Sequence, residues 1–285
     1  METGKLVSMG AMEMVIGLVP TATVKELSSG TNKVFRLLEE SGESTVVKVY
    51  ATPARERRER HALESMLGIP GVPQILERGA TDGMAWIRTT DGGSWSLANL
   101  PLNLDLVRKA GALLRGVHDS GAPITNLDNG IDGDYVKTHF QSTLDRLERF
   151  RRRLGLPAEV LEAARRSDNH PVASAPKPAH TRTLPKNFLV NELGDLMLVG
   201  WEWATLAPPE WDLSLATWRF SRTLGNEAAT ALWEGYGGEN SIGNRLEPWV
   251  AYHAAMQMLE AAEQRDGRLG DLGHLVNDLA AAVGR

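Results

Sequence analysis

Up to about residue 90, short segments of apolar residues alternate with polar residues and are separated by turns containing Gly, Ser or Asp. Alternation of this kind, rich in β-branched residues, is typical of antiparallel strands. We expect strands over residues 24–27, 33–38, 45–50, 71–77 and 84–88. Between the third and fourth strands, Thr52 as an N-cap and Pro53 at the first helical position predict a helix that runs to residue 67.

Beyond residue 97 the apolar residues recur at helical spacing. In residues 104–120 they fall on one helical face, at Leu106, Val107, Ala110, Leu113, Leu114 and Val117. Further helices are expected over 134–154, 157–166, 227–236, 248–263 and 271–283, with another beginning near residue 210. The pattern predicts an α+β chain with a small sheet lobe over residues 1–90 and a larger helical lobe over 91–285.

One segment interrupts the helical lobe. The apolar residues 188–190 and 196–199 flank a polar turn with Gly194, which predicts a β-hairpin. A hairpin brings its two flanks to the same edge. The stretch from His180 to Asn187 and the stretch from Gly200 to Glu202 are therefore expected to face one space.

These two flanks resemble the catalytic core of the aminoglycoside phosphotransferase and choline kinase family, relatives of the protein kinases. The family pattern is H-x-D-x-x-x-x-N, a hairpin, then D-[WF]-E. His180 and Asn187 match the His and the Asn, and Trp201 with Glu202 matches the end of the second motif. The resemblance spans roughly residues 21–262 and implies a two-lobed, protein-kinase-like fold.

Two positions depart from the family pattern. Arg182 stands where the catalytic Asp is expected, and Gly200 stands where the metal-holding Asp is expected. A guanidinium stays protonated and has no acceptor, so Arg182 cannot take a proton from an acceptor hydroxyl. Gly200 has no side chain and so offers no side-chain ligand to Mg²⁺. Asn187 then remains as a metal ligand, with Glu202 as the one carboxylate that could substitute.

The positive charge of Arg182 leaves two interpretations open. With Lys48 and Lys186 it could bind an anion without metal. Alternatively it could pair with Glu202 or Asp212 and close the nucleotide pocket. Asp212 lies in a W-D-L segment whose Asp, in the family, braces the catalytic loop from behind.

The resemblance also implies a nucleotide site in the sheet lobe. Lys48 corresponds to the ATP lysine and Glu59 to its partner, and Gly30 lies in the phosphate-covering turn. The flexible polar connector over residues 89–94 is the hinge at which adenine pairs, with Arg88 and Thr89 as the cofactor-binding residues there. Each residue also has an ordinary interpretation: Lys48 as an exposed strand residue, Glu59 as one charge on a solvated helix, and Gly30 as a turn signal.

We therefore expect a pseudokinase: a phosphotransferase scaffold with impaired catalysis that acts as a binding or scaffolding module. The alternative is an active ATP-dependent kinase of a small-molecule hydroxyl group, with displaced ligands such as Glu202. ATP and Mg²⁺ are the implied cofactors, and the missing carboxylates weaken the metal site in particular. The basic run at Arg149 and residues 151–153 argues against an acidic pocket for an aminoglycoside.

Composition narrows the partners further. The chain has no cysteine, which excludes disulfides and thiolate metal sites. A net charge of -5 and a pI near 5.9 do not favour nucleic acid or an anionic membrane as partner. Glu13 interrupts the apolar N-terminal stretch, against a signal peptide, and no window is apolar enough to span a membrane. We expect a cytoplasmic protein of bacterial type that binds a small molecule or a protein partner.

Overall fold

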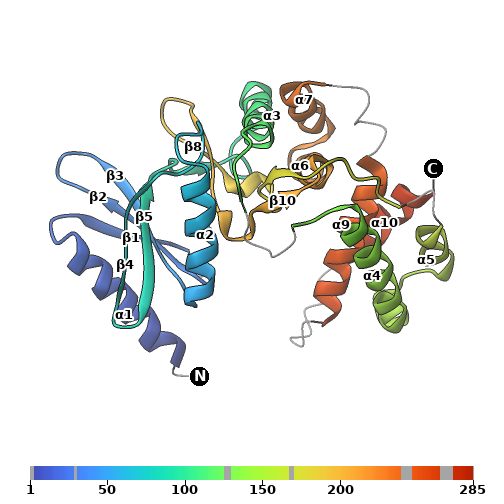
Figure 1. Cartoon of the computed structure of the whole chain (residues 1–285), viewed down its shortest axis with the longest axis horizontal. Coiled ribbons are helices and arrows are strands. Elements are labelled where there is room, and N and C mark those ends of the chain that lie inside the picture. The colour runs from blue at the N-terminus through green and yellow to red at the C-terminus, as the bar shows by residue number, and fades with distance from the viewer. Residues whose placement is uncertain are drawn as a thin grey trace.

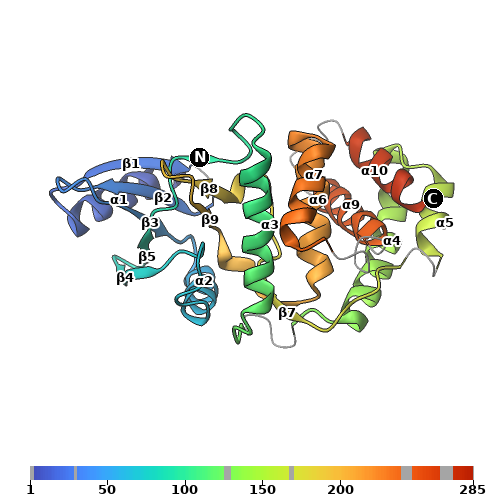
Figure 2. The same ribbon diagram turned by 90° about the horizontal axis from the view of Figure 1, so that it is seen from above.

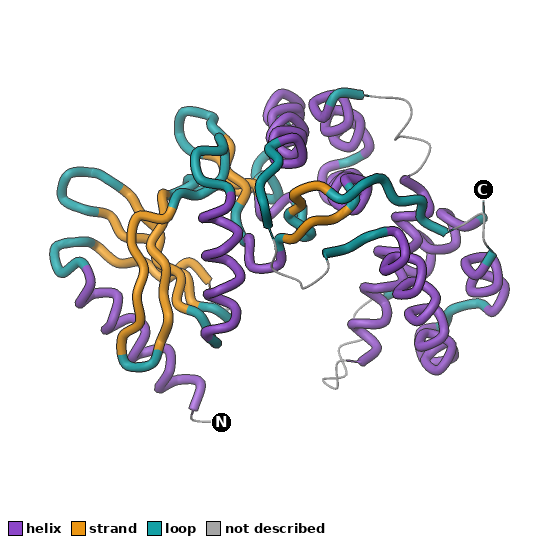
Figure 3. Tube along the Cα trace, viewed as in Figure 1, coloured by secondary structure: helices purple, strands orange, loops and turns teal. Residues whose placement is uncertain are grey.

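The computed structural model describes residues 3–28, 31–124, 130–166, 170–238, 246–263 and 272–284. Within them a sheet lobe is followed by a helical lobe, as Figures 1 and 3 show. The sheet lobe contains five antiparallel strands in the order β1-β2-β3-β5-β4, with bounds Thr23–Ser28, Lys33–Leu38, Ser44–Val49, Met84–Thr90 and Ile75–Thr81 respectively. The expected α+β fold with an antiparallel sheet lobe is confirmed.

A helix covers each face of this sheet (Figure 1). Helix α1 (Thr3–Leu18) packs on the outer face through Ala11, Met14 and Val15, against side chains of β2, β3 and β5. Helix α2 (Pro53–Ser65) lies on the inner face. Because successive strand residues point to opposite faces, β3 directs Val47 and Val49 toward α1 and Lys48 toward the inner side.

The helical lobe has two cores. In the first, α3 (Leu104–Asp119) packs closely on α7 (Asn226–Tyr236), because Gly111 and Gly235 leave room for the backbone of the facing helix. A Cβ at Gly111 would lie 2.1 Å from the carbonyl oxygen of Leu232. Helix α6 (Pro209–Leu224) also belongs to this core, and it faces the second core as well.

The second core lies at the far end of the lobe from the sheet (Figure 2). It is built from α4 (Gly133–Leu154), α5 (Ala158–Arg165), α9 (Leu246–Glu263) and α10 (Gly273–Val283). Helix α4 is bounded as its sequence dictates: the side chain of Asp132 accepts a hydrogen bond from the amide of Tyr135 at the start, and Gly155 takes the left-handed conformation at the end.

Short strands lie between the lobes. Strands β8 (Phe188–Val190) and β9 (Leu196–Leu198) form the expected hairpin, and β6 (Trp95–Ser96) pairs with β8. A second pair, β7 (Lys177–Ala179) with β10 (Thr205–Ala207), was not predicted. The hairpin is flanked by two 3-10 turns, η2 (Pro185–Asn187) and η3 (Trp201–Trp203), so the two motif segments lie together.

Candidate active site

Asp212 holds the loop that begins at His180. Its carboxylate accepts hydrogen bonds from the amides of His180 and Thr181, both at 2.7 Å, and its backbone carbonyl accepts one from the hydroxyl of Thr183, also at 2.7 Å. Both Asp212 and His180 are fully buried. The network fixes Thr181 at a φ of 64°, which is rare for a β-branched residue. The geometry agrees with the bracing role that the resemblance implies for Asp212.

His180 connects this loop to the hairpin. Its Nε2 donates to the carbonyl of Val199 at 3.1 Å, its Nδ1 accepts from the amide of Arg182 at 3.2 Å, and the ring lies edge-on to Trp201 with centroids 4.6 Å apart. Burial lowers the pKa of the imidazole below its ordinary value. A neutral ring that uses both nitrogens within the protein positions the loop, and it is not arranged as an acid or base.

Asn187 and Gly200 lie next to each other, as the family pattern requires. The side-chain amide of Asn187 donates to the carbonyl of Arg182 at 2.7 Å, and its backbone carbonyl accepts from the amide of Val199 at 2.9 Å. A Cβ at Gly200 would lie 3.9 Å from Nδ2 of Asn187. Gly200 adopts φ 91°, a conformation that favours glycine. The metal position therefore presents backbone and one amide.

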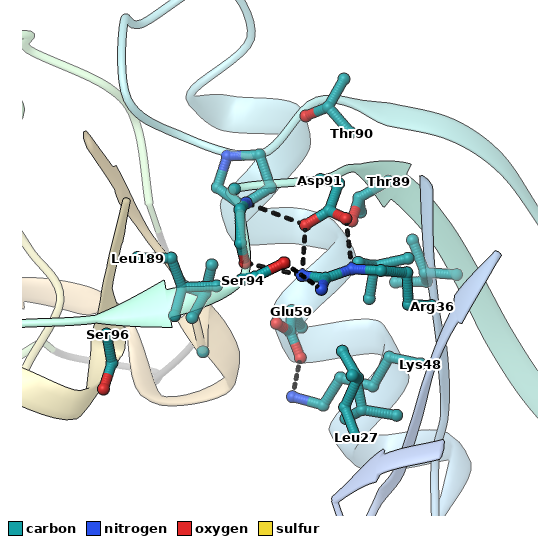
Figure 4. A pocket seen from close by; sticks show the side chains of 18 of the residues that line it. Leu27, Arg36, Lys48, Glu59, Thr89, Thr90, Asp91, Ser94, Ser96 and Leu189 are labelled. Atoms are coloured by element: carbon teal, nitrogen blue, oxygen red, sulfur yellow. Dashed lines mark hydrogen bonds and ion pairs between the residues drawn. The ribbon is translucent and has the colours of Figure 1, made fainter. Parts of the chain in front are cut away.

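Lys48 lies between two carboxylates. Its Nζ is 2.5 Å from Oε2 of Glu59 and 3.5 Å from Oε2 of Glu202 (the first pair is drawn in Figure 4). Burial acts to lower the pKa of Lys48, but the two carboxylates outweigh it and the pKa lies above its ordinary value. The predicted Lys48–Glu59 pairing is thus present in the structure, and Glu59 is 5% exposed, not part of a solvated face.

Tyr50 completes the surroundings of Glu59. Its hydroxyl donates to Oε2 of Glu59 at 2.9 Å, while the amide of Trp201 donates to Oε1 at 3.3 Å. Burial, and then the charge of Glu59, raise the pKa of Tyr50 well above its ordinary value. Glu59, which belongs to α2, therefore links this helix to β3 and to the turn η3 after the hairpin.

Glu202 is committed to other groups of the protein. Its Oε2 accepts a hydrogen bond from Nδ2 of Asn32 at 2.7 Å, and its Oε1 lies 3.9 Å from the guanidinium of Arg55. The carboxylate that sequence reasoning offered as a metal ligand is thus surrounded by donors. Asn32 was not singled out from the sequence, because its partner lies 170 positions away and no local pattern connects them.

Arg182 pairs with neither of the two acids that were considered as its partners. Its side chain is exposed, and its guanidinium lies over the ring of Trp203 at 5.6 Å. In the part of the chain that the structure describes, no carboxylate lies within 4.0 Å of it. Pairing with Asp212 or Glu202 is therefore not what the structure shows, since both acids have other partners.

A cavity of about 390 Å³ lies between the lobes, beside these residues (Figure 4). Lys48 and Glu59 line it from the sheet lobe, Thr89 from the hinge, and Val199 and Gly200 from the far side. Gly30, expected to cover the phosphates, lies outside the described residues.

Arg88 does not line this cavity. It points to the outer face of the sheet, donates to the hydroxyl of Thr45 at 3.0 Å and pairs with Glu39. The neighbours Ile87 and Thr89 do line the cavity, because side chains alternate along β5. The expected role of Arg88 in holding a nucleotide is not supported by this position.

Arg36 and Asp91 close the hinge end of the cavity. Arg36 donates from Nε and Nη2 to the two carboxylate oxygens of Asp91, at 2.5 and 3.0 Å, and from Nη2 to the carbonyl of Gly93 at 2.6 Å (Figure 4). Ser44 donates to the same carboxylate at 2.5 Å. Gly93 must be glycine here, because a Cβ would lie 2.2 Å from the carbonyl oxygen of Val190. Sequence reasoning took this hinge as flexible and missed the pair.

The cavity fits a nucleotide better than it fits a metal. Lys48 and the hinge line one continuous space, as a triphosphate and base require. For a divalent metal, no group of three His, Asp or Glu side chains suited to coordination is found among the described residues. Hard divalent cations need several oxygen ligands, and Gly200 supplies no side-chain oxygen.

Fold and site together define a kinase-like phosphotransferase scaffold. A family model described as "Phosphotransferase enzyme family" matches residues 23–280, and the chain belongs to this family. No curated protein matches the chain significantly.

Solved structures agree on the fold. A thermostable mutant of aminoglycoside phosphotransferase APH(4)-Ia, in complex with ADP and hygromycin B, is 15% identical, with TM-score 0.70 over 95% of this chain and 97% of that one. A choline/ethanolamine kinase family protein from Mesorhizobium loti is 18% identical, with TM-score 0.68 over 97% and 93%. Spectinomycin phosphotransferase APH(9)-Ia, with ADP and spectinomycin, is 16% identical, with TM-score 0.62 over 95% and 98%.

No helix of the described residues is long and apolar enough to cross a membrane.

Proposed function

We propose that this chain is a catalytically impaired phosphotransferase homologue, a pseudokinase-type binding module that holds a nucleotide without metal-dependent phosphoryl transfer. Phosphoryl transfer asks a protein mainly for positioning and for neutralisation of charge, and Mg²⁺ supplies much of the latter. The observation that carries the proposal is the metal position: Gly200 has no side chain, and the nearby carboxylate of Glu202 is bound to Asn32.

Arg182 also supports impaired catalysis, because it stands where the family pattern places the residue that acts on the hydroxyl acceptor. A protonated guanidinium neither accepts a proton nor orients a hydroxyl as a carboxylate does. Loss of one such catalytic group commonly lowers the rate by about three orders of magnitude or more. The hydroxyl acceptor of an active enzyme would meet a cation here, where the family pattern places a base.

Nucleotide binding is supported by the retained half of the site. Lys48 keeps its partner Glu59, and both line the cavity. The ADP in the hygromycin B complex of the similar enzyme supports a nucleotide as occupant. Without a metal, the phosphates would be held by Lys48 and by backbone groups near Gly200.

Two measurements on the same protein test the proposal. ATP, with Mg²⁺ or with EDTA, should raise the unfolding free energy equally, by about 2.7 kcal/mol at a concentration 100 times its Kd. Lys48→Met should abolish this stabilisation by ATP. Lys33→Met is the control: Lys33 pairs with Glu26 at an exposed site, so this variant should still be stabilised by ATP. No ADP should form in the presence of Mg²⁺ and hydroxyl acceptors.

Turnover at about 1 to 100 per second, the usual range of kinases, would overturn the proposal and establish an active enzyme with displaced ligands. So would stabilisation by ATP that depends on Mg²⁺. An absence of any ATP effect would overturn the nucleotide part.

A further inference from the structure

A second cavity, of about 330 Å³, lies in the helical lobe on the far side of η3 from the first. Gly200 lines the first cavity and Trp203 lines the second, so the three-residue turn separates them. Its other walls come from α4, α6 and α9, the helices in the right half of Figure 1. A neighbouring cavity of about 410 Å³ shares Arg182, Leu215, Gln257 and Glu260 with it. Arg182 therefore borders both.

These adjoining cavities carry unpaired positive charge. Arg182 and Arg219 line them, and neither guanidinium has a carboxylate of the described residues within 4.0 Å. Nε of Arg219 is buried without a hydrogen-bond partner, while its Nη1 donates to Gln257 at 3.4 Å. A buried donor without a partner is costly, so a ligand oxygen that reached it would be stabilising.

Opposing negative charge is sparse. Glu260 is the single acidic residue among the described residues lining these two cavities. His139 and His253 add no positive charge near neutral pH, because burial lowers the pKa of each. Taken together, the two adjoining cavities have Arg182 in both and Arg219 in the larger one, against one exposed carboxylate. This balance of charge favours an anion and disfavours a polycation such as an aminoglycoside.

The walls of the second cavity are aromatic. Tyr135, Trp203 and Trp211 line it, and the Arg182 guanidinium lies over the Trp203 ring at 5.6 Å from its centroid. Planar rings pack against such side chains edge-on or offset, and an Arg held over a ring keeps its hydrogen-bond donors free at the edge. The geometry suits a ligand with a flat apolar part and an acidic group beside it.

We propose that this cavity binds a small planar organic anion, an aromatic carboxylate whose acid group is held by Arg182 and whose ring packs among Trp203, Trp211 and Tyr135. The inference rests on the proposed function in that Arg182 acts in binding and not in phosphoryl transfer. The residue that replaces the catalytic acid thus becomes the recognition residue of the neighbouring site.

Calorimetry with a matched pair of probes tests this assignment on the full chain without nucleotide. Indole-3-acetate should bind, and its neutral analogue indole-3-acetamide should bind about tenfold more weakly or worse, because a bidentate Arg–carboxylate contact is lost. Arg182→Ala should weaken the binding of indole-3-acetate by a similar factor. Arg152→Ala removes an exposed arginine of α4 outside the cavity and should leave the affinity unchanged.

Any of three results would overturn the proposal: no binding of indole-3-acetate, equal affinity for the acid and the amide, or unchanged affinity in Arg182→Ala. Tighter binding of kanamycin A than of indole-3-acetate would also overturn it. Since Arg182 is exposed, its replacement should leave the thermal unfolding midpoint unchanged, which the same samples verify. ADP formation from ATP, measured separately, bears on the proposed function alone.

Discussion

The side chain of Asn32 donates to the carboxylate of Glu202 at 2.7 Å, across 170 positions of sequence. The other end of the same amide, Oδ1, accepts from the amide of Ala51 at 3.1 Å. Asn32 is 8% exposed, so both contacts are sheltered from water. Asn32, which immediately precedes β2, thereby joins the segment after β3 to the segment that follows the hairpin, and the two lobes are tied near Lys48.

Replacement of Asn32 by Ala should lower the free energy of unfolding by about 1 to 2 kcal/mol, because two sheltered hydrogen bonds lose their partner. The neighbouring Lys33→Ala is the control. Lys33 contacts Glu26 at 3.5 Å in an exposed pair, and its loss should cost less than about 1 kcal/mol. Urea denaturation measures both, and equal costs would contradict the role given to Asn32.

The double replacement Arg182→Asp and Gly200→Asp should make ATP binding dependent on Mg²⁺. The Cβ at position 200 meets nothing closer than Asn187, so a carboxylate fits beside that amide. The left-handed backbone at Gly200 should cost about 1 kcal/mol of stability. Calorimetry with ATP, with and without Mg²⁺, measures the gain, and each single replacement serves as control. An unchanged trace in the double variant would count against the assignment of these two positions.

Asp91→Ala should destabilise the chain by about 2 to 3 kcal/mol, because Arg36 would be left without its carboxylate at the hinge. The side chains of the pair are 16% and 8% exposed, which shields the pair from solvent. Asp105→Ala is a suitable comparison: its side chain is 88% exposed and pairs with Arg108, so the cost should stay below about 1 kcal/mol. Chemical denaturation of the two variants distinguishes a structural hinge pair from a surface pair.

Stability should fall as the pH drops from 7 to 5, in part because of His253. Burial lowers the pKa of His253 to about 4, while Nε2 donates to the carbonyl of Trp211 at 3.0 Å. The unfolded chain binds a proton near its ordinary pKa of about 6.5 and the folded chain does not, so stability rises with pH in this window. One such histidine contributes about 2 kcal/mol between pH 7 and pH 5. His253→Gln should flatten the profile in urea denaturation, and a profile as steep as that of the original chain would contradict this account.

The motif segments were predictable because they carry local signals. The hairpin, its two flanks, the lysine strand and the helix with Glu59 were all expected where the structure has them. Turn residues and the alternation of apolar positions fix such elements within a few residues of sequence. The spacing of His180 and Asn187 then located the loop, and the buried Asp212 contacts fit the bracing that the family implies.

The rest depended on contacts between distant segments. Asn32, Arg36 and Trp203 have partners that are far from them in the sequence, and no local pattern predicts such pairs. Arg88 was placed at the hinge by sequence proximity alone, without regard to the face of the strand on which its side chain lies.

Helix α1 was not predicted, although its sequence contains a helical pattern of apolar residues. Ala11, Met14, Val15 and Leu18 recur at helical spacing, and Glu13, which interrupts the apolar stretch, is on the exposed side. The interruption was taken as evidence against a leader, and it equally marks the water-facing side of an amphipathic helix.

That helix also matters to anyone who shortens the gene. The family match begins at residue 23, so a truncation designed on it would remove α1 completely. Phe35, Leu37, Val47 and Trp86, which α1 shelters, would then form a bare apolar surface on a twisted sheet. The truncated protein should aggregate during purification. Its aggregation would reveal nothing about nucleotide binding by the full chain.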